Sequence, residues 1–323
     1  MITLRLKPGP GVLQQAFDSL PPEGNARILL APGVYREKAV LARPDVVLEG
    51  ESAETTRILW DDGAKTLLAD GFKRGTFRTA TLMLDGDRVT LRHLTVENAA
   101  APREEAGQAV ALYCDGDGIL LEDCVLLGHQ DTLFTAPLPP REVEPRGFIG
   151  PKEFAPRRQQ RHIYRRCRVQ GDVDFIFGGA AALFEDCDIV ISDGRRDKSR
   201  AGAAYCTAAS TPEGQPFGYV FHRCRFLKGD AERHSVYLGR PWREWAKTVL
   251  VDCLLEDHIH PDLFHDWGKP LFHQVGRFAL ADCEGPGMSR APADFVCLLT
   301  HEEGQRYLEE ARDFLDVLHS PVL

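Results

Sequence analysis

The sequence lacks any apolar run long enough to cross a membrane, and its beginning lacks a signal-peptide pattern. A transmembrane helix needs about 20 consecutive apolar residues. The first residues, MITLRLKPGPGVLQQAF, do not contain the apolar stretch and small residues that precede a signal-peptide cleavage site. We therefore expect a soluble cytoplasmic protein, or a secreted one if a leader has been removed.

Positive charge is in deficit, with 39 Lys and Arg residues against 48 Asp and Glu residues and a net charge of −9. Nucleic acids and anionic membranes are not expected as partners, because both repel a negative protein. The apolar fraction of 43% is enough for a large core. We expect a single folded domain over residues 1–323, acting as a monomer.

CxxC pairs are also missing, although the chain has nine cysteines. Zinc and redox sites usually place cysteines in such pairs. Because the sequence around these cysteines is apolar, we expect buried thiols in a reducing compartment rather than a disulfide framework.

Six of the cysteines mark a repeat: an apolar residue, two others, Cys, any residue, then usually an apolar one. These are Cys124, Cys167, Cys187, Cys224, Cys253 and Cys283, and Leu94 takes the cysteine position in a seventh segment. The intervals between them are 43, 20, 37, 29 and 30 residues, so the shortest indicates a unit of about twenty residues with insertions elsewhere.

Units of this length that are rich in β-forming residues and lack helical crossovers predict a parallel β-helix. The cysteines would then form a ladder inside it. A β-propeller or β-sandwich is the alternative, and it is disfavoured because propeller blades would repeat more regularly.

Two segments with helical spacing lie near the ends of the chain. They are PGVLQQAFDSLP (10–21) and HEEGQRYLEEARDFLDVL (301–318), the second with Leu308, Ala311, Leu315 and Leu318 on one side. We expect them to cap the ends of the coil, since terminal repeats need a cover. The Pro- and Arg-rich segment 136–160 has no periodicity and predicts a long loop.

Two aspartates stand in matching positions of consecutive units. Asp131 and Asp174 each follow a ladder cysteine, Cys124 and Cys167, by seven residues. Adjacent strands lie about 4.8 Å apart, so both carboxyl groups should meet on one face. At an effective dielectric near 20 they repel by roughly 3 kcal/mol, or about two pKa units. One would keep its proton, which provides an acid beside a nucleophile; the alternative is that each only caps a turn.

Polar and aromatic residues elsewhere could complete such a site. Arg240 is a cation that could keep one carboxylate ionised, and Trp242 is a flat surface on which a sugar could stack. Gln108 and Gln130 are amides within apolar strands, and they could bind a developing oxyanion. Taken singly, each of these residues would more often be structural.

Five short motifs together resemble the pectin methylesterase (pectinesterase) family. In the family's order they are GVYRE (33–37), GQAVAL (107–112), GHQDTLF (128–134), DFIFGG (174–179) and LGRPW (238–242). The resemblance implies a right-handed parallel β-helix, which agrees with the fold predicted from the repeat. It also implies hydrolysis of galacturonate methyl esters, in pectin or its oligosaccharides, without a metal or other cofactor.

The family's catalytic residues map onto five positions of this chain. Asp174 matches the nucleophile, and Asp131 matches the acid that protonates methanol and later activates water. Gln108 and Gln130 match the amides at the oxyanion, and Arg240 matches the arginine that binds the nucleophile. The resemblance also implies three substrate-binding side chains in the cleft, Trp242, Phe177 and Phe134.

The chain departs from the family pattern at two places. Gly179 stands where the family usually has Asn, and NAAA (98–101) replaces the commoner NTAG. Neither change affects a proposed catalytic residue.

Several alternatives remain open. Paired aspartates on a β-helix also occur in polygalacturonases, and a carboxyl separation near 5 Å suits a retaining glycosidase. A non-catalytic carbohydrate-binding β-helix is a further alternative. A metal site among His258, His260, His265 and His273 is disfavoured, because their spacing lacks a tetrahedral pattern. Arginines in 141–166 and 195–200 could attract demethylated units of the substrate.

Overall fold

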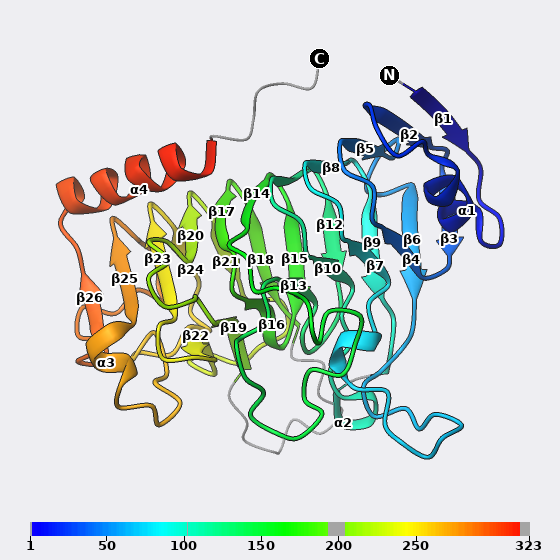
Figure 1. Cartoon of the computed structure of the whole chain (residues 1–323). Helices are drawn as coiled ribbons and strands as arrows, with labels where there is room; N and C mark the ends of the chain where they lie inside the picture. Colours follow the sequence, from blue (N-terminus) through cyan, green and yellow to red (C-terminus); the bar gives the residue numbers. More distant parts are fainter. Residues whose placement is uncertain (1, 102, 193–203, 317–323) are drawn as a thin grey trace.

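The computed structural model describes residues 2–101, 103–192 and 204–316, and parallel strands wound into successive coils dominate it (Figure 1). Each complete coil contributes one strand to each of three sheets, and all pairings between the named strands are parallel. The predicted parallel β-helix is confirmed.

The three sheets are named A, B and C. Sheet A contains β1 (Ile2–Leu6), β2 (Ala26–Leu30), β5 (Val46–Glu49), β8 (Val89–Arg92), β11 (Ile119–Glu122), β14 (Arg161–Arg165), β17 (Ala181–Glu185), β20 (Tyr219–His222), β23 (Lys247–Val251), β25 (Arg277–Ala281) and β26 (Val296–Leu298). Sheet B contains β3 (Gly33–Arg36), β6 (Thr56–Trp60), β9 (Thr95–Asn98), β12 (Val125–Leu127), β15 (Arg168–Gly171), β18 (Asp188–Ile191), β21 (Arg225–Leu227) and β24 (Leu254–Leu255). Sheet C contains β4 (Ala39–Leu41), β7 (Leu82–Leu84), β10 (Leu112–Cys114), β13 (Leu133–Thr135), β16 (Val173–Gly178), β19 (Ala204–Ala209) and β22 (Val236–Pro241). The helices are α1 (Val12–Ser19), α2 (Arg103–Ala106), α3 (Phe272–Val275) and α4 (His301–Asp316), with a short 3₁₀ turn, η1 (Thr76–Arg78).

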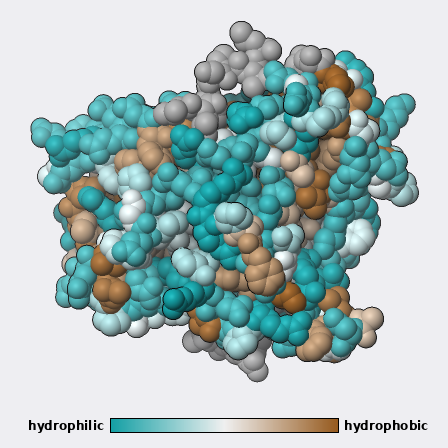
Figure 2. Space-filling model, viewed as in Figure 1, coloured by the Kyte–Doolittle hydropathy of each residue, from teal (hydrophilic) through white to brown (hydrophobic). Residues whose placement is uncertain are grey.

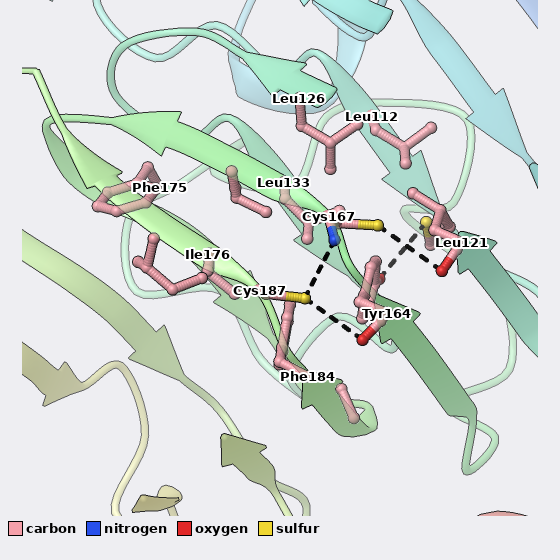
Figure 3. Close-up of a cluster of buried hydrophobic side chains, with 14 of the residues drawn as sticks. Leu112, Leu121, Leu126, Leu133, Tyr164, Cys167, Phe175, Ile176, Phe184 and Cys187 are labelled. Atoms are coloured by element: carbon pink, nitrogen blue, oxygen red, sulfur yellow. Dashed lines mark hydrogen bonds between the residues drawn. The ribbon is translucent and has the colours of Figure 1, made fainter. Parts of the chain in front are cut away.

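One apolar core fills the interior of the coil from Leu13 to Val296, and the cysteine ladder runs through it. The thiol of Cys187 donates to the Tyr164 carbonyl oxygen of the preceding coil, with sulfur and oxygen 3.4 Å apart (Figure 3). All nine cysteines are free, and seven are buried as predicted. The prediction is wrong for the two nearest the C-terminus, because Cys283 is half-buried and Cys297 is exposed.

The residue before each ladder position has a left-handed backbone conformation. Its φ lies between 50° and 54° at His93, Asp123, Arg166, Asp186, Arg223, Asp252 and Asp282, which we call the turn row. This conformation bends the chain between sheets A and B. Asp tolerates left-handed φ better than most residues do, which explains why four of the seven are Asp.

The first predicted cap lies where expected. Leu13 and Phe17 of α1 pack into the core beside the first strands of the coil. At the other end Phe272 of α3 is buried against Phe278, with ring centroids 4.5 Å apart. The coil is therefore closed at both ends.

The second predicted cap is placed differently, because α4 lies along the outer face of sheet A instead of over the end of the coil (Figure 1). Leu308, Ala311 and Leu315 pack on outward-facing apolar residues of this sheet such as Leu183 and Val251. The prediction failed because a helix with an apolar side packs on any apolar face, and the sequence did not indicate which one. Leu318 falls outside the described residues.

The segment between β13 and β14 forms the predicted long loop, without strand or helix between residues 136 and 160, and Figure 1 shows it in green below the sheets. In the described ranges no helix is long and apolar enough to span a membrane. The face in Figure 2 is largely hydrophilic, and its hydrophobic areas are small and separate.

Candidate active site

A cavity of about 410 Å³ opens on the outer face of sheet C. Seven of the eight side chains predicted for the site line it, namely Gln108, Gln130, Asp131, Asp174, Phe177, Arg240 and Trp242. They come from four of five successive coils, because parallel in-register pairing places residues from distant sequence positions side by side. Phe177 lies beside Ala208, and Ala208 beside Arg240, across β16, β19 and β22.

A β-bulge explains how a carboxylate can stand in an apolar strand. Between Val173 and Ile176 the pairing of β16 with β19 shifts by one residue, and Asp174 has a φ of 49°. Phe175 and Ile176 consequently both enter the core, as Figure 3 shows, although they are consecutive. Asp174 faces the cavity instead. Bulges commonly re-aim a side chain beside an active site in this way.

Asp131 reaches the same cavity from the preceding coil. Leu133 pairs with Ile176, so the offset of 43 residues predicted for the two aspartates is the register of β13 and β16. Asp131 also has a left-handed φ, 67°. Non-glycine residues in this conformation cost of order 1–3 kcal/mol and cluster at functional sites. The predicted convergence of the two aspartates on one face is therefore observed.

Arg240 binds Asp174 through two hydrogen bonds. Its Nε donates to Oδ1 at 2.9 Å and its Nη2 to Oδ2 at 2.6 Å. The guanidinium carbon lies 3.9 Å from the ring centroid of Tyr205 and 3.7 Å from that of Trp267. These two rings hold the guanidinium in one orientation, and hence hold the Asp174 carboxylate.

The two carboxyl groups lie in different electrostatic surroundings. Burial raises the pKa of Asp131 well above its usual value, and the Asp174 carboxylate raises it further. Burial alone would lower the pKa of Arg240, but its hydrogen bonds to Asp174 outweigh this and the pKa is raised. The site therefore places Asp131, whose pKa is raised, beside an Asp174 carboxylate that is paired with Arg240. Surroundings that differ in this way favour the protonated form of one carboxyl group and the ionised form of the other.

The amide side chains of Gln108 and Gln130 line the cavity and are half-buried. The backbone at these positions is hydrogen-bonded between coils, since the Ala109 amide donates to the Gln130 carbonyl oxygen at 3.0 Å. Asn98 supports this region, because its side-chain amide donates to the carbonyl oxygens of Thr79 and Val110 at 3.2 and 3.0 Å. Asn98 begins the NAAA segment, but no motif in the sequence indicated this supporting role.

An aromatic cluster forms the floor of the cavity. Phe177 is 4% exposed and lines the cavity, whereas Phe134 is fully buried beneath it. The predicted contact of Phe134 with substrate is therefore corrected: its ring supports Phe177, with centroids 4.8 Å apart. Phe148 comes from the 136–160 loop and packs edge-on against Trp242 at 6.2 Å. Phe148 could not be predicted from the sequence, because the loop has no repeat from which to place it.

Gly179, which departs from the family pattern, lies close to the start of the same loop. A Cβ atom at this position would meet the Pro137 carbonyl oxygen at 2.8 Å. Any side chain here would require the loop to move, so glycine fits the local packing.

Several basic residues of segment 141–166 are paired within the chain, and the attraction that its arginines were expected to exert on demethylated units stays a prediction. Lys152 pairs with Asp85, Arg158 pairs with Asp87 and Arg161 pairs with Asp117. Arg157 donates to the carbonyl oxygens of Pro139 and Glu153. These residues bind the loop to acidic turns of the coil. The sequence did not indicate this, because the carboxylate partners lie far from the loop along the chain. The arginines in 195–200 lie outside the described residues.

The four histidines of 258–273 are dispersed. His258 is fully buried, His260 stacks on Tyr237 with centroids 4.3 Å apart, and the Nε2 atom of His273 lies 3.1 Å from an Asp266 oxygen. Burial lowers the pKa of His258 to about 4. Across the described parts of the chain, no three His, Cys, Asp or Glu side chains form a group that could hold a metal ion. The segment instead contributes Trp267, which the sequence analysis missed because the histidines around it suggested a different chemistry.

Known proteins resemble most of this chain. The family model described as Pectinesterase matches residues 11–138 and 156–291. Pectinesterase QRT1 of Arabidopsis thaliana is 31% identical over 94% of this chain and 73% of its own length. Probable pectinesterase/pectinesterase inhibitor 64 of the same plant is 32% identical over 86% of this chain, which spans 44% of that protein.

Solved structures resemble the whole coil. Pectin methylesterase PemA from Erwinia chrysanthemi is 25% identical with a TM-score of 0.76, covering 99% of this chain and 97% of its own. A pectin methylesterase mutant in complex with a hexasaccharide is 25% identical with a TM-score of 0.77, covering 96% of this chain and 94% of its own.

Proposed function

Because the chain belongs to the pectinesterase family, we propose that it removes methyl groups from methyl-esterified galacturonate chains and releases methanol. The family match confirms the resemblance found in the sequence, and the solved relatives support pectin demethylesterification as the activity. One observation carries the proposal for the site: the Asp174 carboxylate, held by Arg240, lies in one cavity with the buried carboxyl group of Asp131, whose pKa is raised by burial.

In the first step, an Asp174 oxygen attacks the ester carbonyl carbon at C6 of a galacturonate unit. The carbonyl oxygen becomes an oxyanion, which the amide N–H groups of Gln108 and Gln130 stabilise. The tetrahedral intermediate then breaks its bond to the methoxy oxygen, and Asp131 donates its proton to that oxygen. Methanol leaves, and the galacturonyl group remains on Asp174 as an acid anhydride.

In the second step, the ionised Asp131 takes a proton from water, and the water oxygen attacks the acyl carbon. The bond to Asp174 breaks, the free carboxylic acid of the product is released and both aspartates regain their starting states. Arg240 stabilises the Asp174 carboxylate as it reforms. Phe177 and Trp242 provide the apolar surface beside the sugar.

The test is methanol release from methylated oligogalacturonides by the wild type and by Asp174→Asn. We expect wild-type release without new reducing ends, and a loss of about a thousandfold or more in the variant, because the covalent step is removed. Equal rates in both proteins would falsify the assignment of the nucleophile. New reducing ends without methanol would favour the glycosidase alternative.

Asp186→Asn is the matched control. Asp186 also has a left-handed φ and accepts two hydrogen bonds from an arginine, Arg223, but it lies in the turn row. A comparable loss in this variant would show that Asp174→Asn acts through folding rather than chemistry.

Other expectations continue as proposals. A single domain over residues 1–323 is supported by the one core that extends from Leu13 to Val296. The monomeric state and the cytoplasmic location, with secretion as the alternative, stay predictions. Sedimentation of the purified chain and fractionation of the source cells test them.

A further inference from the structure

We propose that His265 is a positioning residue for the esterase reaction, because its neutral imidazole holds the turn that places Trp267 against Arg240. This inference rests on the proposed function. His265 is half-buried, and the lining of the cavity in the described residues does not include it. It therefore acts through the aromatic rings around Arg240 and not on the substrate itself.

Trp267 has a left-handed backbone conformation, with a φ of 55°. A bulky residue rarely adopts this conformation, and it does so only where the surrounding structure holds it there. The Trp267 indole lies against Arg240, with the guanidinium carbon 3.7 Å from the ring centroid, and Arg240 binds Asp174. The orientation of the nucleophile therefore depends on what stabilises the turn at Trp267.

Two consecutive side chains hold this turn. The Trp267 backbone amide donates to Nδ1 of His265, and the Gly268 amide donates to Oδ1 of Asp266, each at 2.9 Å. In both pairs a side chain accepts from the backbone two residues ahead, as Asn and Asp do in Asx-turns. Because a backbone amide can only donate, Nδ1 of His265 carries no proton, and the neutral ring has its proton on Nε2. A protonated ring would offer the Trp267 amide no acceptor.

The His265 ring also contacts the second aromatic neighbour of Arg240. It lies edge-on to Tyr205 and to Tyr237, with ring centroids 5.9 and 5.3 Å away. The Tyr205 ring centroid lies 3.9 Å from the guanidinium carbon of Arg240. His265 therefore supports both rings that orient this guanidinium, one through a hydrogen bond and the other through packing.

The charged groups around His265 indicate what its protonation would do. The titratable groups next to the turn come from β19, β22 and the segment of His265 itself, and they are Tyr205, Tyr237, Arg240, Asp266, Lys269 and, packed on Tyr237, His260. The Gly268 amide and His273 keep the pKa of Asp266 below its usual value, so this carboxylate is ionised beside the ring. Protonation of His265 would gain this anion as a neighbour but would break the bond to Trp267. Activity should therefore fall when the ring gains a proton.

The first experiment compares His265→Asn with His265→Leu. Asn offers an acceptor to the amide two residues ahead and does not titrate, whereas Leu has the same branched shape without an acceptor. We expect kcat for methanol release to fall about tenfold in His265→Leu and less than about threefold in His265→Asn, with KM changed less than about twofold in both. Equal kcat values in the two variants, or a loss confined to KM, would overturn the positioning role.

The pH profile tests the requirement for a neutral ring. Between about pH 8 and about pH 5 histidine side chains gain protons and asparagine does not. The ratio of kcat in His265→Asn to kcat in the wild type should therefore rise about fivefold over this range. Effects on Asp131 and Asp174 cancel in the ratio because both proteins contain them. A ratio that does not change with pH would overturn the proposal.

His260→Leu is the matched control. Nδ1 of His260 accepts from the Asp262 backbone amide at 3.1 Å, which is the same kind of bond in the same segment. The cavity lining in the described residues includes Trp267 but not Asp262. We expect kcat to change by less than about twofold. A tenfold loss in this control would show that any break in the segment reduces activity, and would overturn the assignment to His265.

Nuclear magnetic resonance of the nitrogen-labelled wild type tests His265 without catalysis. At about pH 8 we expect the His265 proton on Nε2, and the Trp267 indole signal should shift as the ring gains a second proton. A proton on Nδ1 at this pH, or an indole signal that does not respond, would overturn the positioning role alone. A wild type with the expected spectra that releases no methanol would overturn the proposed function instead.

Discussion

Two aspartate–arginine pairs of this chain share a local geometry but lie in different surroundings. Asp186 in the turn row has a φ of 54° and binds Arg223 at 2.8 and 2.7 Å. Asp174 in sheet C has a φ of 49° and binds Arg240 at 2.9 and 2.6 Å. The aspartate side chain is 45% exposed in the first pair and 10% exposed in the second.

The difference shows that the pair itself does not make a catalytic site. An exposed pair contributes about 0–1 kcal/mol because water screens it, and Asp186 serves the turn. The buried pair has a second carboxyl group beside it, that of Asp131, and burial together with the Asp174 carboxylate raises the pKa of Asp131. Under the proposed function, the surroundings of the pair therefore matter more than the pair itself.

Asp131→Asn is the strongest test of that conclusion, because it removes the second carboxyl group and keeps the pair. We expect kcat/KM for methanol release to fall by about a thousandfold, the contribution of a general acid. Asp123→Asn, in the turn row, is the control and should change kcat/KM less than twofold. A similar loss in both variants would contradict the proposed role.

The pH dependence of the wild type should report the same group. The pKa of Asp131 is raised, so kcat/KM should fall as pH rises through that pKa and the acid form is lost. Between pH about 4, where Asp131 titrates in the unfolded chain, and its raised pKa in the folded chain, the folded chain binds more protons than the unfolded chain. The free energy of unfolding should therefore decrease as pH rises between these two pKa values. Urea unfolding of Asp131→Asn over the same range should lack this slope.

Arg240→Met removes the cation of the buried pair, and Arg223→Met removes that of the exposed pair. We expect the first to lower kcat/KM about a hundredfold, because an unpaired Asp174 near Asp131 is more readily protonated. The second should change kcat/KM less than twofold. Parallel effects of the two substitutions on methanol release would show that burial does not distinguish the pairs.

Trp267→Ala should lower kcat about tenfold, since the ring helps to orient Arg240. Trp267→Phe should restore most of the activity, and KM should change less than kcat. Trp60→Ala removes the contact between Arg36 and Trp60, 5.5 Å from guanidinium carbon to ring centroid, and serves as the control. A loss confined to KM would assign Trp267 to substrate binding instead of positioning.

Cys187→Ala tests the cysteine ladder next to the turn row and should not affect methanol release. Cys187 follows Asp186 and is fully buried, so we expect the free energy of unfolding to fall by about 1–2 kcal/mol as a cavity forms and the thiol hydrogen bond is lost. Cys297→Ala, at an exposed position, should change it by less than about 0.5 kcal/mol. Urea unfolding of both variants provides the measurement.

The repeat made it possible to predict from the sequence which residues lie side by side in the coil. Cys124 and Cys167 are separated by 43 residues, as are Asp131 and Asp174, and β13 pairs with β16 in that register. Parallel coils place matching positions side by side. The interval between two cysteines was therefore sufficient to predict which carboxyl groups meet.

Residues outside the repeat could not be placed in this way. Phe148 and Trp267 reach the cavity from irregular segments, and Phe134 lies under Phe177 instead of beside the substrate. In segment 141–166, Arg158 and Arg161 pair with Asp87 and Asp117 of acidic turns. No period relates such partners, so charge and shape complementarity over long sequence separations decide them.

The sequence alone determined the coil, its cysteine ladder and the meeting of Asp131 with Asp174, because these depend on a local period that is written in the chain. Only the tertiary structure decided the walls of the cavity and the face on which α4 lies. Those features depend on contacts between segments that share no repeat. Such contacts contribute free energy only after the whole coil has brought the segments together.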